Sequence, residues 1–169
     1  MKKFLLVFAA IAALVSCKNA VKDLDSEYAV DMIKKGEALP TFSLEDRTGV
    51  VRTPADFAGK YVVYDFWATW CPDCRADLPA MKELYEKYGN KVAFVGISFD
   101  TEPEKLDAYV AENGIGWVQV SDFVSKKESK VADDFRVKWI PSMYLVGPDG
   151  KVLLGTGMVD KLAAALEAL

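Results

Sequence analysis

The 169-residue chain contains no histidine, and this absence excludes several kinds of catalytic and metal-binding site. No histidine-based triad and no zinc site with a histidine ligand can form. Cysteine is scarce as well: Cys17, Cys71 and Cys74 are too few for a four-cysteine zinc site. We therefore expect no bound metal and no other cofactor. Acid–base chemistry falls to carboxylates, thiols, lysine or tyrosine.

The chain also lacks an excess of basic residues. Lys and Arg number 21 against 25 Asp and Glu, which gives a formal net charge of −4. A nucleic-acid binder would carry a basic surface, so no nucleic-acid partner is expected. Hydrophobic residues make up 51% and charged residues 27%, a composition typical of a globular protein. The length predicts one domain with a short appendage.

No apolar run is long enough to cross a membrane comfortably, since about 20 residues are needed. Residues 4–15 are apolar, follow two lysines and precede Ser16-Cys17, a pattern that predicts a secretory signal over residues 1–16. Residues 14–17, Leu-Val-Ser-Cys, resemble a bacterial lipobox, which predicts a lipid anchor at Cys17. A plain signal peptide is the alternative. Lys18 provides no aspartate signal for inner-membrane retention, which favours the outer membrane.

Residues 17–38 are polar and of mixed charge, and we interpret them as a tether, with a partly helical segment as the alternative. The domain is predicted over residues 39–169, where strand and helix patterns alternate. Strands are predicted at 41–44, 50–52, 61–67, 92–99, 117–120, 142–146 and 152–155, and helices at 74–88, 103–113, 126–135 and 158–169. This alternation predicts an α/β fold with a mixed sheet covered on both faces, parallel at its centre and ending in an antiparallel hairpin.

The motif Cys71-Pro72-Asp73-Cys74 follows the predicted central strand and begins a helix. The free N–H groups and the dipole of a helix N-terminus stabilise a thiolate, so the pKa of a cysteine there falls. The spacing allows a small disulfide ring. We expect Cys71 to be the more exposed, attacking thiol and Cys74 the more buried, resolving thiol. A purely structural disulfide is the alternative, but so short a loop would constrain the unfolded chain little.

Residues 65–74, Asp-Phe-Trp-Ala-Thr-Trp-Cys-Pro-Asp-Cys, resemble the active-site segment of the thioredoxin superfamily. Residues 75–79, Arg-Ala-Asp-Leu-Pro, resemble its membrane-tethered TlpA/ResA-like branch. The resemblance covers residue 39 to the end of the chain. It implies a thioredoxin fold with an N-terminal β-hairpin and an inserted strand–helix segment, together with thiol-disulfide exchange.

The same resemblance implies a substrate site. Ile140-Pro141 matches the cis-proline loop that lies against the cysteines and offers backbone atoms to a substrate strand; an ordinary trans proline is the alternative. Trp70 and Pro72, with Ile140 and Pro141, are then expected to contact the substrate. Trp70 and Trp139 are equally compatible with partly buried core positions.

Asp65 interrupts an apolar strand, where a carboxylate is costly to bury. The resemblance implies that an acid here relays the proton of the resolving cysteine. TlpA/ResA-like proteins more often place the acid on the helix, and this chain has both Asp65 and Asp77. The strand predicted at 92–99 lacks the lysine that thioredoxins keep beside the buried acid, and Gly96 stands at the matching position. Burial should therefore raise the pKa of Asp65, whereas Asp77 is either a mechanistic acid or a solvated acid of the first helical turn.

These residues predict an enzyme, a thiol-disulfide oxidoreductase acting on protein disulfides in the bacterial cell envelope. Trp70 and Ile140 resemble reducing members, whereas Pro72 resembles some oxidants; we interpret the protein as a reductant. Its partners would be protein thiols or disulfides and an unidentified membrane electron donor, and the chain would be a monomer. The alternatives are a thiol peroxidase, of which Thr69 is a faint sign, and a non-catalytic metal-delivery module, for which Met143 is the candidate ligand.

Overall fold

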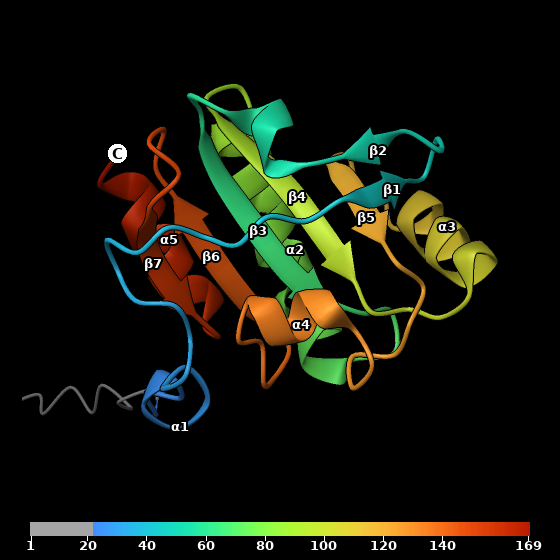
Figure 1. Cartoon of the computed structure of the whole chain (residues 1–169), viewed down its shortest axis with the longest axis horizontal. Helices are drawn as coiled ribbons and strands as arrows, with labels where there is room; N and C mark the ends of the chain where they lie inside the picture. Colours follow the sequence, from blue (N-terminus) through green and yellow to red (C-terminus); the bar gives the residue numbers. More distant parts are fainter. Residues whose placement is uncertain (1–21) are drawn as a thin grey trace, which may run out of the picture.

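A seven-stranded mixed sheet forms the centre of the computed structural model, which describes residues 22–169 (Figure 1). The predicted signal segment and Cys17 lie outside the described residues. The strand order is β2-β1-β5-β4-β3-β6-β7. The strands are β1 (Leu44–Asp46), β2 (Val51–Arg52), β3 (Tyr61–Trp67), β4 (Val92–Ser98), β5 (Val118–Ser121), β6 (Ser142–Val146) and β7 (Val152–Thr156).

The pairing of the strands confirms the predicted α/β thioredoxin-type architecture. β3 is parallel to β4 and β4 to β5, whereas β6 is antiparallel to both β3 and β7. β1 and β2 form the N-terminal hairpin, which joins the sheet through β5. All residues of β3 except the first are buried, which explains why this strand is a continuous apolar run in the sequence.

Helices cover both faces of the sheet. They are α1 (Asp25–Tyr28), α2 (Pro72–Tyr88), α3 (Pro103–Glu112), α4 (Lys130–Asp134) and α5 (Val159–Glu167), with a 3-10 turn at Pro54–Phe57. α2 and α5 pack together on one face, and α4 lies over the other, where Phe135 contacts Phe66 of β3 (Figure 1). The inserted segment after β4 is α3 followed by β5. No helix within residues 22–169 combines the length and the apolar character that a membrane crossing requires.

Three local predictions differ from the structure. The first strand, predicted at 41–44, is β1 at Leu44–Asp46, because Glu45 and Asp46 pair with β5. The helix predicted at 126–135 is shorter, because residues 125–128 form a turn and Ser129 caps α4 by accepting a hydrogen bond from the Ala132 N–H. The 3-10 turn at Pro54–Phe57 was not predicted; Thr53 and Asp56 stabilise it through a reciprocal capping box.

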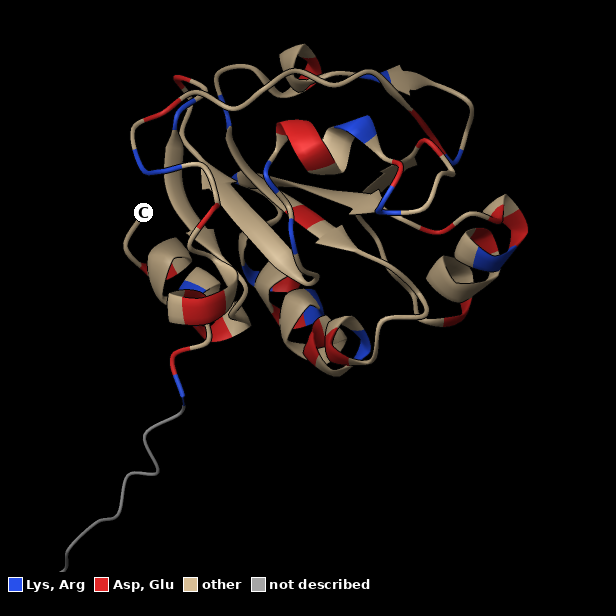
Figure 2. Cartoon of the chain, turned by 60° about the horizontal axis from the view of Figure 1, so that its bottom comes forward, with Lys and Arg blue, Asp and Glu red and all other residues tan. Residues whose placement is uncertain are grey.

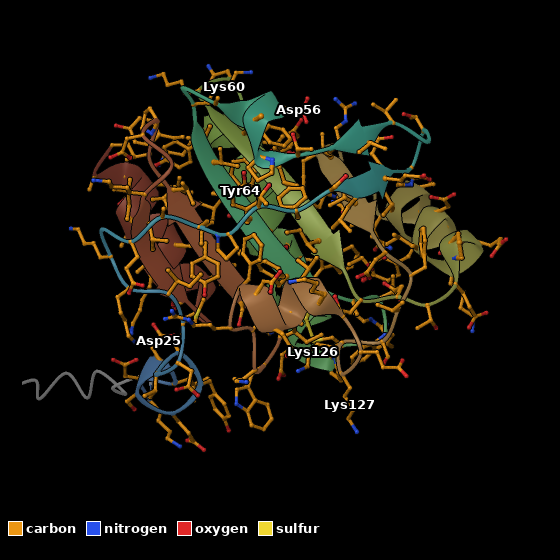
Figure 3. The ribbon with its side chains drawn as sticks, in the orientation of Figure 1. Asp25, Asp56, Lys60, Tyr64, Lys126 and Lys127 are labelled. Carbon is orange, nitrogen blue, oxygen red and sulfur yellow. A yellow bond between two sulfur atoms is a disulfide. The ribbon has the colours of Figure 1, made fainter. Side chains whose placement is uncertain are left out.

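The described part of the predicted tether is packed against the domain. Ala29, Met32 and Ile33 are buried, and the Ile33 N–H donates a hydrogen bond to the Tyr144 hydroxyl at 3.0 Å. Asp25, labelled beside α1 in Figure 3, accepts hydrogen bonds from Thr156 and Gly157. The apolar residues of this segment find a complementary surface on β6 and β7, so residues 22–38 are part of the folded unit rather than a free linker.

Candidate active site

The two cysteines of the motif lie where β3 passes into α2, and they are joined by a disulfide with their Cα atoms 5.3 Å apart. Cys71 is the N-cap of α2, Pro72 occupies the first turn, and the Cys74 N–H points to the Cys71 sulfur at 3.2 Å. Proline suits this first turn because its missing N–H would have no partner inside the helix. The sulfur of Cys71 therefore sits at the positive end of a 17-residue helix, as predicted from its position.

The expected difference in exposure between the two cysteines is wrong. Cys71 is 4% exposed and Cys74 6% exposed, so both are buried in this disulfide-linked state. The reason is the loop before β6, whose Ile140 carbonyl oxygen lies 3.7 Å from the Cys71 sulfur and covers it. Exposure therefore gives no support to the attacking role expected of Cys71, and its helix-terminal position is the remaining argument for that expectation.

The Ile140-Pro141 peptide bond is cis and lies against the disulfide, as the resemblance implied. Trp70 and Trp139 are 57% and 55% exposed, which excludes the alternative that they are core aromatics. The Tyr28 ring packs edge-on against Trp139, with the ring centroids 4.9 Å apart. The disulfide is thus set among exposed aromatic side chains suited to contact with another polypeptide.

Asp65 lies behind the disulfide on β3, in register with Gly96 of β4 and Met143 of β6. Its side chain is buried, and within residues 22–169 its carboxyl group forms no hydrogen bond or ion pair. Burial, reinforced by the negative charge of Asp77, raises the pKa of Asp65 to about 7. An acid with this pKa exchanges protons readily at neutral pH.

Asp65, Cys74 and Asp77 line one small cavity of about 10 Å³ between the sheet and α2, roughly the room that one water needs. Asp77 is half-buried, and its pKa is raised by burial and by the negative charges of Asp160 and Asp73. The structure therefore brings both candidate acids close to Cys74, and neither is a freely solvated surface group.

Gln119 occupies the position beside Gly96 on the same face of the sheet. A Cβ atom on residue 96 would lie 2.1 Å from the Gln119 Oε1. That oxygen accepts a hydrogen bond from the Trp67 Nε1–H at 2.9 Å, which holds the amide in place. A lysine cannot replace glycine here without displacing Gln119, so no cation reaches Asp65 from β4.

Asp100 is a site residue that the sequence analysis missed. Its buried carboxylate accepts hydrogen bonds from the Thr69 N–H at 3.0 Å, the Thr69 hydroxyl at 2.6 Å and the Ser98 hydroxyl at 2.7 Å. These bonds hold the loop that leads into Cys71. The sequence did contain a signal for its place in the site. Asp100 comes just after β4, and neighbouring parallel strands such as β3 and β4 end at the same edge of a sheet.

A family model described as thioredoxin-like matches residues 59–152, the span from the start of β3 to the start of β7. The chain belongs to the thioredoxin-like family. It is 31% identical to the thiol-disulfide oxidoreductase ResA of Oceanobacillus iheyensis over 96% of this chain and 82% of that protein. It is 32% identical to the thioredoxin-like protein YneN of Bacillus subtilis over 71% of this chain and 69% of that one.

Solved structures of thioredoxin-like proteins agree with this assignment. A thiol-disulfide oxidoreductase from Bacteroides fragilis superposes with a TM-score of 0.73 at 26% identity, covering 78% of this chain and 98% of its own. The thioredoxin domain of a thiol-disulfide oxidoreductase from Bacteroides vulgatus gives 0.73 at 28% identity, covering 80% and 97%. Together with the Cys71–Cys74 disulfide, these relatives make the chain a thiol-disulfide oxidoreductase.

Proposed function

We propose that this thiol-disulfide oxidoreductase reduces disulfides of partner proteins in the bacterial cell envelope. The observation that carries the proposal is the Cys71–Cys74 pair at the N-terminus of α2, held against the Ile140-Pro141 loop and backed by a buried acid. A partner strand that pairs with this loop would place its own disulfide beside the Cys71 sulfur.

The exchange takes place in two steps. In the first, the Cys71 thiolate attacks one sulfur of the partner's disulfide; that bond breaks, a mixed disulfide forms, and the released thiolate takes up a proton. In the second, the Cys74 thiol gives its proton to Asp65 across the shared cavity, and its thiolate attacks the Cys71 sulfur. The partner's second sulfur leaves as a thiolate and takes up a proton, and the Cys71–Cys74 disulfide remains. The partner gains two electrons and two protons, and a membrane electron donor regenerates the dithiol.

Trp70 before Cys71 and Ile140 before Pro141 favour the reducing direction. Thioredoxin has a reduction potential of about −270 mV and the oxidant DsbA one of about −120 mV. We expect the Cys71–Cys74 couple to lie nearer the first value in a redox titration.

Insulin reduction tests the activity itself: catalysis is expected, while no catalysis would favour a peroxidase or a metal-delivery module. The redox titration reports the reducing role and the insulin assay reports the activity, so the two claims can fail separately.

We further propose that the protein is anchored through a lipid on Cys17, in the outer membrane, and acts as a monomer. The lipobox supports the anchor. Since the described chain is held to the domain from Asp23 onward, only residues 18–21 separate Cys17 from residue 22, and these five residue steps span at most about 18 Å. The described chain begins close to α1, near the active site, so the dithiol would lie close to the membrane surface (Figure 1).

A further inference from the structure

A groove of about 500 Å³ lies beside the dithiol, between the start of the described chain, the cis-proline loop and the beginning of α5. We call it the acidic groove. Its apolar lining comes from Leu24, Tyr28, Trp139, Ile140, Pro141 and Met158. Three carboxylates, Asp73, Asp77 and Asp160, complete it. Asp77 and Pro141 also line the small cavity that contains Asp65, so the groove adjoins the reacting groups.

One wall of the groove is built by the N-terminal segment and is already in place. Asp25 accepts hydrogen bonds from the Thr156 hydroxyl at 2.7 Å and the Gly157 N–H at 2.8 Å, and Tyr28 packs against Trp139. A partner therefore meets a formed surface and does not have to order this segment on binding.

The three carboxylates of the groove are not neutralised by an ion pair within the described chain. Within residues 22–169, Asp73, Asp77 and Asp160 form no ion pair. The nearest lysine in the sequence, Lys161, is held by Asp23 and Asp25. Figure 2 marks acidic positions on α5 and on the adjoining start of the described chain.

The basic residues near the active site lie outside the groove. Arg75, between Asp73 and Asp77 in the sequence, lines a different groove along α2. Lys126 and Lys127 are beneath α4 in Figure 3, and neither lines the groove. The mutual repulsion of the three carboxylates contributes to the raised pKa of Asp77, and a cation placed among them would relieve that repulsion.

We infer that the acidic groove binds the partner segment adjoining the reacting cysteine and selects segments that combine a lysine or arginine with an apolar side chain. The apolar lining would receive the apolar side chain beside Trp139, and Asp160 with its neighbours would pair with the cation. This inference rests on the proposed function and specifies its substrate class. Positively charged partners should therefore form the mixed disulfide with Cys71 faster than neutral or acidic ones.

The test uses three synthetic peptides that each contain one cysteine capped as a 2-pyridyl disulfide. They share a sequence except for the residues flanking the cysteine, which are Lys, Gln or Glu. The rate at which reduced protein releases 2-thiopyridone reports attack by Cys71. At low ionic strength we expect the Lys peptide to react about fivefold faster than the Gln peptide, and the Glu peptide to be slower by a similar factor. The rates should converge near 1 M salt, where the Debye length falls to about 3 Å.

Asp160→Asn provides the localised test, and Glu104→Gln, an exposed acid of α3 outside the groove, is the matched control. Both remove one negative charge, so both change the net charge equally. Asp160→Asn should reduce the Lys-to-Glu rate ratio at least about twofold, and the control should preserve it. Equal rates for the three peptides in the wild type, or the same loss in both variants, would overturn the inference. Insulin reduction run in parallel reports on the proposed function alone, and the salt series on the wild type remains decisive if Asp160→Asn does not fold.

Discussion

The Asp65→Asn variant tests the role of the buried acid through stability and kinetics together. The carboxyl group has an ordinary pKa of 3.8 and a pKa of about 7 in the folded protein. Between these two values the folded chain keeps a proton that the unfolded chain has lost, so stability falls as the pH rises from about 4 to about 7. The change corresponds to about 4 kcal/mol, a large part of the 5–15 kcal/mol that typically stabilises a protein.

Asparagine preserves the shape of the side chain and cannot ionise. Urea denaturation of the disulfide-linked protein at about pH 4 and about pH 8 measures the change in the free energy of unfolding between the two conditions. Keeping the disulfide intact prevents the cysteines from titrating. We expect Asp65→Asn to lose about 4 kcal/mol less than the wild type across this interval. Glu104→Gln, which removes an exposed acid, should retain the wild-type difference.

The same substitution should slow the second chemical step. Near neutral pH, attack by Cys74 on the mixed disulfide should fall about 100-fold, because its proton acceptor is gone, while attack by Cys71 changes little. Stopped-flow kinetics with a disulfide peptide separates the two steps. A variant with the wild-type pH dependence of stability and the wild-type rate of resolution would refute the reasoning and transfer the role to Asp77.

Three further predictions follow from the site and the sequence. Cys74→Ser should trap mixed disulfides with partner proteins, visible on non-reducing gels, whereas Cys71→Ser should trap none; equal trapping would contradict the assignment of the nucleophile. Labelled palmitate should enter the wild type and not Cys17→Ala, and a labelled variant would disprove lipidation at this position. Asp100→Asn, which can no longer accept all its hydrogen bonds from Thr69 and Ser98, should destabilise the fold by about 1–3 kcal/mol in urea and slow insulin reduction, whereas unchanged stability would show that this carboxylate does not hold the loop.

The predicted strands agree with the structure where a local pattern is sufficient. β3 and β6 have the predicted limits, because each is an apolar run of strand length, too short for a typical helix, bounded by polar residues or turns. The segment before residue 39 shows the opposite case. Its few apolar residues are equally compatible with a helix or a linker. They are buried only because the folded sheet places β6 and β7 beside them, where the Tyr144 hydroxyl also accepts a hydrogen bond from the backbone of the segment.

The exposure of Cys71 is a second feature that the local sequence pattern could not predict. A residue at a helix entrance is usually accessible, and the sequence contains nothing that reports how closely the Ile140 carbonyl approaches. The raised pKa of Asp65 was predicted, because a carboxylate in an apolar strand is desolvated whichever residues surround it. The contribution of Asp77 to that pKa required the position of α2 over the sheet.

The local sequence already specifies the chemical groups of this protein: two cysteines at a strand-to-helix junction, a helix terminus that favours a thiolate, and an acid in a buried strand. Each follows from interactions between residues close together along the chain. The tertiary structure alone decided what surrounds them. Asp100 reaches Thr69 across 31 residues, and Asp25 reaches Thr156 across 131, to hold the active-site loop and one wall of the acidic groove. Such contacts depend on strand order and register, which no local pattern encodes, because the free energy that selects them comes from packing the whole sheet at once.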